Sequence, residues 1–88
     1  MLKISVTNHS NEVTQFRLEG KLVGPGVEEL RRLSDEALAR KKAVSLDLEK
    51  VWFIDAQGIA LLRDLAEKRV SQLNCSQFIS QQLKKGAL

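Results

Sequence analysis

The side chains of this sequence that could perform chemistry are few and scattered. His9 and Cys75 are its only histidine and its only cysteine, and they lack the paired spacing that would hold zinc. No serine, cysteine or carboxylate constellation accompanies His9 for nucleophilic or acid/base catalysis. Asp47, Glu49 and Asp55 are close in sequence, but we expect their side chains to point in different directions. The sequence therefore predicts no enzyme activity, no cofactor and no metal site. His9 is interpreted as a solvated loop residue and Cys75 as a small buried apolar one.

The junction that does suggest a function lies at Asp55, where the apolar run 51–54 ends and an amphipathic segment begins. At a helix start, this carboxylate can accept hydrogen bonds from the free N–H groups of Gln57 or Gly58. Gly58 would let another chain or an anion approach the backbone, to which the helix N-terminus offers partial positive charge. Gln57 can donate and accept hydrogen bonds without carrying charge. The residues leave two interpretations open, a structural cap and a binding surface.

Two aromatic residues, Trp52 and Phe53, stand just before this junction. Because successive side chains of a strand point to opposite sides, we expect one of them in the core and the other near the surface. Packing is the simpler role for both, whereas an exposed Trp52 would be a suitable anchor for a partner.

Hydrophobic periodicity predicts the elements that must position the junction. Apolar and polar residues alternate over 2–7 and 13–19, which predicts two strands of an antiparallel hairpin. Gly24-Pro25-Gly26 opens a helix whose basic residues at 40–42 suit its C-terminal end. We then expect a strand over 43–54, a helix from 56 to about 71, a short edge strand within 72–76 and a helix from 76 to 85. The predicted inner face of the helix from 56 consists of Ile59, Leu62, Leu65, Ala66 and Arg69 or Val70.

The order strand, strand, helix, strand, helix, strand, helix implies a crossover to a parallel strand. We therefore expect an α/β fold: a single domain over residues 1–88, with a mixed β-sheet of about four strands and helices packed mainly on one face. Formal net charge is +3, from 14 Lys and Arg against 11 Asp and Glu, and the two signs are interspersed. This pattern favours a solvated surface over nucleic-acid binding. No long apolar run follows the first residues, so we expect no signal peptide, no membrane insertion and a cytoplasmic protein.

The segment from Leu46 to Leu62 is similar to the strand, "Asp-Ser-Ser-Gly-Leu" turn and helix start of the STAS domain family, the fold of bacterial anti-sigma factor antagonists. Leu18-Glu19-Gly20-Lys21-Leu22 resembles a second family signature just before the first helix. The resemblance implies a STAS-like fold and a binding face at the turn and helix start. The partner-binding residues that it implies are Asp55, Ala56, Gln57, Gly58, Ile59, Leu62 and Arg63.

Two departures from the family pattern concern the same chemistry. In partner-switching members, a kinase-type anti-sigma factor phosphorylates a serine or threonine at the second position after the aspartate, and here that position is Gln57. Neither Gln57 nor Ala56 has a hydroxyl group, so the resemblance predicts no phosphorylation of the turn. Val23 stands where the family often has a further aspartate. The resemblance thus implies the binding face without its phospho-switch.

These observations predict a protein-interaction module that resembles an anti-sigma factor antagonist and docks a protein partner over residues 55–62. The alternative is a STAS subunit that regulates the ATPase of a membrane lipid-transport complex of the ABC type. Binding of a nucleotide or another anion at the helix N-terminus ranks below both, because no glycine-rich phosphate loop accompanies it. A homodimer that covers the sheet edge or helix face near residues 73–83 is a further expectation.

Overall fold

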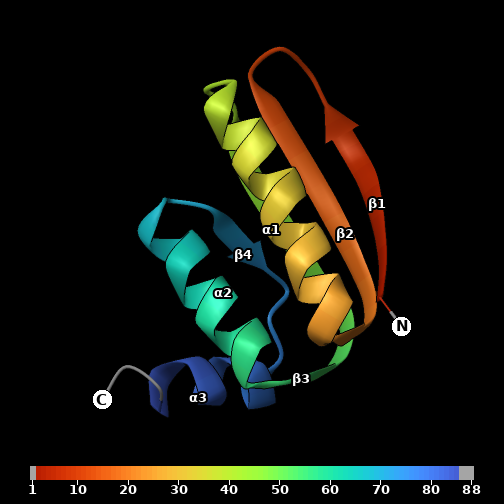
Figure 1. Ribbon diagram of the computed structural model, residues 1–88, viewed down its shortest axis with the longest axis vertical. Coiled ribbons are helices and arrows are strands. Elements are labelled where there is room, and N and C mark those ends of the chain that lie inside the picture. Colours follow the sequence, from red (N-terminus) through yellow and green to blue (C-terminus); the bar gives the residue numbers. More distant parts are fainter. Residues whose placement is uncertain (1, 86–88) are drawn as a thin grey trace.

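The computed structural model describes the backbone of residues 2–85 and the side chains of residues 2–83. Four strands and three helices follow one another in this part of the chain (Figure 1). The elements are β1 (Leu2–His9), β2 (Val13–Leu22), α1 (Gly24–Ala39), β3 (Ala43–Ile54), α2 (Ala56–Glu67), β4 (Ser71–Leu73) and α3 (Gln77–Lys85). The strands form one sheet in the order β1-β2-β3-β4.

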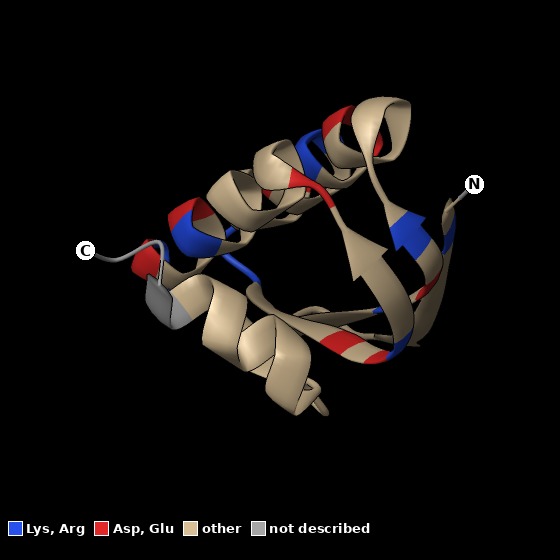
Figure 2. Cartoon of the chain, turned by 90° about the horizontal axis from the view of Figure 1, so that it is seen from below, with Lys and Arg blue, Asp and Glu red and all other residues tan. Residues whose placement is uncertain are grey.

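The sheet is mixed, as the sequence predicts. β1 and β2 form the antiparallel hairpin, whereas β2 with β3 and β3 with β4 pair in parallel. Helix α1 connects β2 to β3 and α2 connects β3 to β4, and both cover the same face of the sheet (Figures 1 and 2). Helix α3 packs against α2, on the side of the molecule away from β1. The predicted α/β fold class is confirmed.

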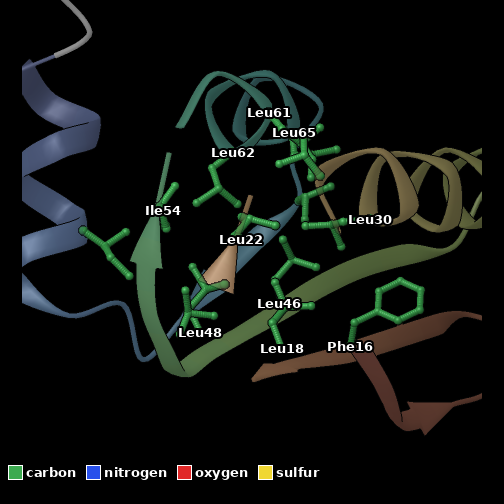
Figure 3. Close-up of a cluster of buried hydrophobic side chains, with 14 of the residues drawn as sticks. Phe16, Leu18, Leu22, Leu30, Leu46, Leu48, Ile54, Leu61, Leu62 and Leu65 are labelled. Atoms are coloured by element: carbon green, nitrogen blue, oxygen red, sulfur yellow. The ribbon is translucent and has the colours of Figure 1, made fainter. Parts of the chain in front are cut away.

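The core lies between the sheet and the pair α1 and α2. Leu18, Leu46 and Leu48 from the strands are fully buried against Leu30 of α1 and Leu62 of α2 (Figure 3). Such close packing of branched aliphatic side chains is what fixes a helix pair on a sheet. Cys75 is half-buried and packs against this cluster, whereas His9 is exposed at the end of β1.

Helix α2 ends earlier than its periodicity suggests, whereas α1 ends just before the basic residues expected at its C-terminus. Each is closed by a basic residue in the left-handed region, Lys41 at φ 60° after α1 and Arg69 at φ 68° after α2. After α2, the N–H of Val70 donates to the carbonyl of Leu65 at 2.9 Å and the N–H of Arg69 donates to that of Ala66 at 3.0 Å. This is the Schellman arrangement, which usually contains a glycine. The prediction of a helix to 71 was wrong because no glycine marks the end. Ala66, which we expected on the inner face, is exposed.

Strand β3 does not alternate strictly in its second half. Leu48, Val51 and Ile54 are buried, and the two residues between each of them are exposed. Two register shifts against β2, after Arg17 and after Gly20, supply the extra residues. Each β-bulge places two residues of β3 opposite one residue of β2, so both members of each pair turn away from the core. The expectation that either Trp52 or Phe53 faces the core was therefore wrong, since both are exposed, at 66% and 45%.

Candidate functional site

The predicted binding turn lies where β2 and β3 end side by side. Because the two strands are parallel, their C-terminal ends meet at one end of the sheet, with Leu22 paired to Ile54. Each strand leads almost directly into a helix, β2 into α1 at Gly24 and β3 into α2 at Ala56. Figure 2 looks onto this end of the molecule. Two helix N-termini, each with unpaired N–H groups, are thus brought together.

Asp55 accepts a hydrogen bond from a backbone N–H group at the start of each helix. Its Oδ1 accepts a hydrogen bond from the N–H of Gly58 at 2.7 Å, which is the predicted N-cap of α2. Its Oδ2 accepts from the N–H of Gly24 at 3.4 Å, at the start of α1. The N-cap residue of α1, Val23, makes no side-chain cap of its own. The bond to Gly24 has no signal in the local sequence, because it joins residues that only the parallel pairing brings together.

Gly58 serves internal packing. It is buried, and a Cβ added there would lie 2.7 Å from the carbonyl oxygen of Leu22 and 2.7 Å from Cγ2 of Ile54. Both distances are shorter than a carbon atom tolerates. The absence of a side chain therefore lets α2 approach the end of β2 closely. The interpretation of Gly58 as an opening for another chain or an anion was wrong, because the protein's own backbone fills that space.

The predicted partner-binding residues fall into two groups. Ala56 and Gln57 are exposed on the first turn of α2, and Arg63 is half-buried further along it. Ile59 and Leu62 face the core, at 9% and 0% exposure. Their helical spacing places Ile59 and Leu62 on the side of α2 that packs against the sheet, so they do not lie on the surface. The exposed surface of the turn therefore consists of Ala56 and Gln57, and the partner-binding role of the predicted residues stays a prediction.

A hollow lies next to the turn, at the start of α1. Its volume is about 550 Å³, and Leu2, Lys21, Val23, Pro25, Gly26 and Glu29 line it. Val23, which replaces the aspartate often found in the family, is half-buried there. The sequence did not predict the hollow, because its lining comes from the first strand, the end of the second and the first helix. Only the alternation that exposes Lys21 could have indicated part of it.

Lys21 connects the hollow to the aromatic pair. Its Nζ lies 4.9 Å from the ring centroid of Trp52, the geometry of a cation–π interaction. Lys21 is paired with Phe53 in the register of β2 and β3, and Trp52 occupies the bulge beside it. Lys21, Trp52 and Phe53 therefore lie together on the helix-free face of the sheet, directly before the Asp55 turn.

A second carboxylate, Asp47, is buried in the middle of β3. Its Oδ1 accepts hydrogen bonds from Nδ2 of Asn74 and from the N–H of Glu49, both at 3.1 Å, and its Oδ2 lies 3.6 Å from Nε of Arg17. The bond from Asn74, then that from Glu49, and finally the charge of Arg17 hold the pKa of Asp47 below its ordinary value. Asp47 thus stabilises the sheet and the loop after β4. Asp47 and Asp55 bind different partners, as we expected of carboxylates that point in different directions.

Residues 2–83 contain no group of three or more histidine, cysteine, aspartate or glutamate side chains placed to hold a metal ion. None of the helices over the described residues is both long and apolar enough to cross a membrane.

Comparison with known proteins agrees with this geometry. The solved structures that are similar to the fold include the anti-sigma factor antagonist SpoIIAA in its unphosphorylated form and the Bacillus cell fate determinant SpoIIAA in its phosphorylated form. The first has a TM-score of 0.71 and 21% identity over 93% of this chain and 82% of that one. The second has a TM-score of 0.70 and 20% identity over 96% of this chain and 83% of that one.

Among proteins with curated descriptions, none matches the sequence significantly. The sequence pattern of the STAS domain, in contrast, matches residues 5–80, which include β2, β3, β4, part of β1 and both helices of the site. The chain therefore belongs to the STAS domain family.

Proposed function

We propose that this protein is a non-catalytic interaction module that docks a protein partner over the Asp55 turn and the first turn of α2, as an anti-sigma factor antagonist would. One observation carries the proposal: Ala56 and Gln57 are exposed where two helix starts converge, on a support that the hydrogen bonds of Asp55 and the close packing of Gly58 hold in place. A site on such a support loses little conformational entropy when a partner binds. The named relative SpoIIAA is itself described as an anti-sigma factor antagonist.

We further propose that the turn carries no phospho-switch. The side chains of Ala56 and Gln57 have no hydroxyl group that could form a phosphate ester. A chain of this kind would bind its partner constitutively, because no added charge can repel the partner. SpoIIAA, in contrast, has been solved in a phosphorylated form. By our proposal, this chain is not phosphorylated at the turn.

Binding is tested by titrating the purified chain with two ATPases: a kinase-type anti-sigma factor and the ATPase of an ABC lipid-transport complex. Those encoded next to this chain are the first choice. We expect binding to the kinase-type protein, and Gln57→Arg to weaken it because a bulkier charged side chain would occupy the contact. Binding to the ABC ATPase instead would support the alternative, a regulatory STAS subunit. No binding to either would overturn both.

The absence of a switch is tested by incubating the chain with the kinase-type anti-sigma factor and ATP, followed by mass spectrometry. The wild-type chain is expected to keep its mass. Gln57→Ser restores a hydroxyl at the acceptor position, and we expect it to gain one phosphate. Ala56→Ser, which adds the same hydroxyl one residue earlier, is the matched control and should remain unmodified. A phosphate on the wild-type turn would contradict the proposal.

A homodimer remains a prediction. Leu73 of β4 and Phe78 of α3 are exposed within the region expected to pair. Light scattering across the micromolar range would test it, and a monomer throughout would count against it.

A further inference from the structure

We propose that the docking surface extends from Gln57 across the helix-free face to the hollow at the start of α1. We call Lys21, Trp52, Phe53 and Val23 the aromatic strip. The strip fits a protein partner that inserts an apolar side chain into the hollow and places a carboxylate beside Lys21. This inference rests on the proposed function, since it specifies what the partner of the same site must present.

The first argument is the exposure of the aromatic pair. Trp52 and Phe53 are adjacent, and the β-bulge turns both of them away from the core. A strictly alternating strand would have buried one of them. Large aromatic residues side by side on a surface expose much apolar area to water, and tryptophan is enriched among the residues that dominate binding energies.

The second argument is the hollow next to the pair. Val23, Pro25 and Leu2 give it apolar walls, and its volume of about 550 Å³ exceeds that of any single side chain. Lys21 lines the hollow and also lies over the ring of Trp52. Lys21 therefore lies between exposed aromatic rings and a concave site. Specific protein interfaces have such complementary shapes.

The third argument is charge. On the helix-free face, Lys3 lies 4.0 Å from Glu19 and Arg17 lies 3.6 Å from Asp47, so the other Lys, Arg, Asp and Glu side chains of β1 and β2 are paired. Among the described residues, Lys21 has no carboxylate within 4.0 Å. Glu29, the acid that lines the hollow, is bound to Arg32 at 2.6 Å. The strip thus presents one uncompensated positive charge beside apolar surface, which a partner carboxylate would complement.

The chain offers a single reporter of this surface, because Trp52 is its only tryptophan. We propose to incorporate 5-fluorotryptophan and to record the ¹⁹F resonance while adding the unlabelled ATPase that binds in the titration above. We expect the resonance to shift and its difference between H₂O and D₂O to shrink, because the partner excludes water from the ring. An unchanged resonance in a saturated complex would overturn the strip and leave the proposed function standing.

Variants supply the second readout, with affinities from calorimetry. Trp52→Ser with Phe53→Ser, and separately Lys21→Glu, are each expected to weaken binding by about tenfold or more. Lys21→Arg keeps the charge and should bind within about twofold of wild type. Phe78→Ser is the matched control, because Phe78 is 55% exposed but lies on α3, outside the strip. Wild-type affinity of the strip variants, with weaker binding of Gln57→Arg, would overturn the inference alone.

The same measurement tests two other possible occupants of the strip, a second copy of the chain and a lipid surface. A ¹⁹F shift that depends on the concentration of the chain alone would assign the strip to a second copy. A shift on adding vesicles of phosphatidylglycerol and phosphatidylcholine would assign it to a lipid surface. Either result would overturn the proposed partner, and the failure of both ATPases to bind would overturn the inference together with the proposed function.

Discussion

The Asp55 turn and the Trp52–Phe53 pair adjoin in the sequence but meet their surroundings in opposite ways. Asp55 and Gly58 make contacts inside the protein. The carboxylate of Asp55 accepts hydrogen bonds from the starts of both helices, and the carbonyl of Leu22 and the side chain of Ile54 occupy the space beside Gly58. Trp52 and Phe53, in contrast, are both exposed, and Lys21 lies over the ring of Trp52. The turn residues that resemble the family signature are thus those that hold the fold, and the surface that we propose for a partner lies beside them.

This contrast separates stability from binding along one stretch of chain. Changes at the turn should reduce the free energy of unfolding, because they remove internal contacts. Changes at the aromatic pair should leave that free energy almost unaltered and act on partner affinity alone. Four variants, the last a double substitution, are given below in order of decreasing expected effect on stability. Asp47→Asn adds a buried carboxylate outside the two regions for comparison.

The largest effect is expected for Gly58→Ala. The new Cβ would meet backbone and a buried side chain at 2.7 Å, so α2 must shift away from β2. We expect the free energy of unfolding to fall by about 2 to 3 kcal/mol in urea denaturation. Gly24→Ala is the matched control, because nothing lies within 4 Å of its added Cβ and only its φ of +44° is unfavourable. It should cost about 1 to 2 kcal/mol. An equal or smaller loss at Gly58 would contradict the packing role.

Asp55→Ala should have the next largest effect. It removes the acceptor for the N–H groups of both Gly58 and Gly24, and loss of an N-cap costs about 1 to 2 kcal/mol. Asp55→Asn keeps an acceptor oxygen for Gly58 but places its NH2 group against the N–H of Gly24, so it should cost less than Asp55→Ala, about 0.5 to 1 kcal/mol. Thermal unfolding followed by circular dichroism measures both. If the two variants were equally destabilised, the charge of Asp55 would matter more than its role as a cap.

The loss of stability caused by Asp47→Asn should depend on pH. Because the folded state lowers the pKa of Asp47, the carboxylate stabilises the protein fully above its unfolded pKa of about 3.9. That contribution is lost as the pH falls through the folded pKa. We expect the variant to be about 1 kcal/mol less stable than wild type at pH 7, and the difference to shrink below about pH 4. Urea titrations of both proteins from pH 7 to pH 2 measure it. A difference independent of pH would show that the charge is not responsible.

The smallest effect on stability is expected for Trp52→Ser with Phe53→Ser. Both side chains are outside the core, so the free energy of unfolding should change by about 0.5 kcal/mol or less. Comparison with Gly58→Ala in the same urea assay gives the contrast directly. A loss of more than about 1 kcal/mol would place the pair among the residues that hold the fold.

Much of the fold could be predicted from the sequence. Alternation over residues 2–7 and 13–19 and the proline at position 25 indicate local structure through short-range sterics, so the element order and the sheet follow. The ends of the helices could not be predicted as well. Lys41 and Arg69 adopt the left-handed conformation that glycine usually supplies, and the sequence carries no mark of this choice.

The candidate site divides in the same way. The sequence by itself determined the cap at Asp55, the missing hydroxyl groups at Ala56 and Gln57, and the family, because each depends on residue type at fixed local spacing. Only the tertiary structure decided that Leu62 is buried, that Gly58 is filled from within, and that Trp52 and Phe53 both face outward. Those outcomes depend on the register of β2 against β3, where two bulges shift the pairing. Register is a property of two strands together, so neither strand's sequence contains it alone.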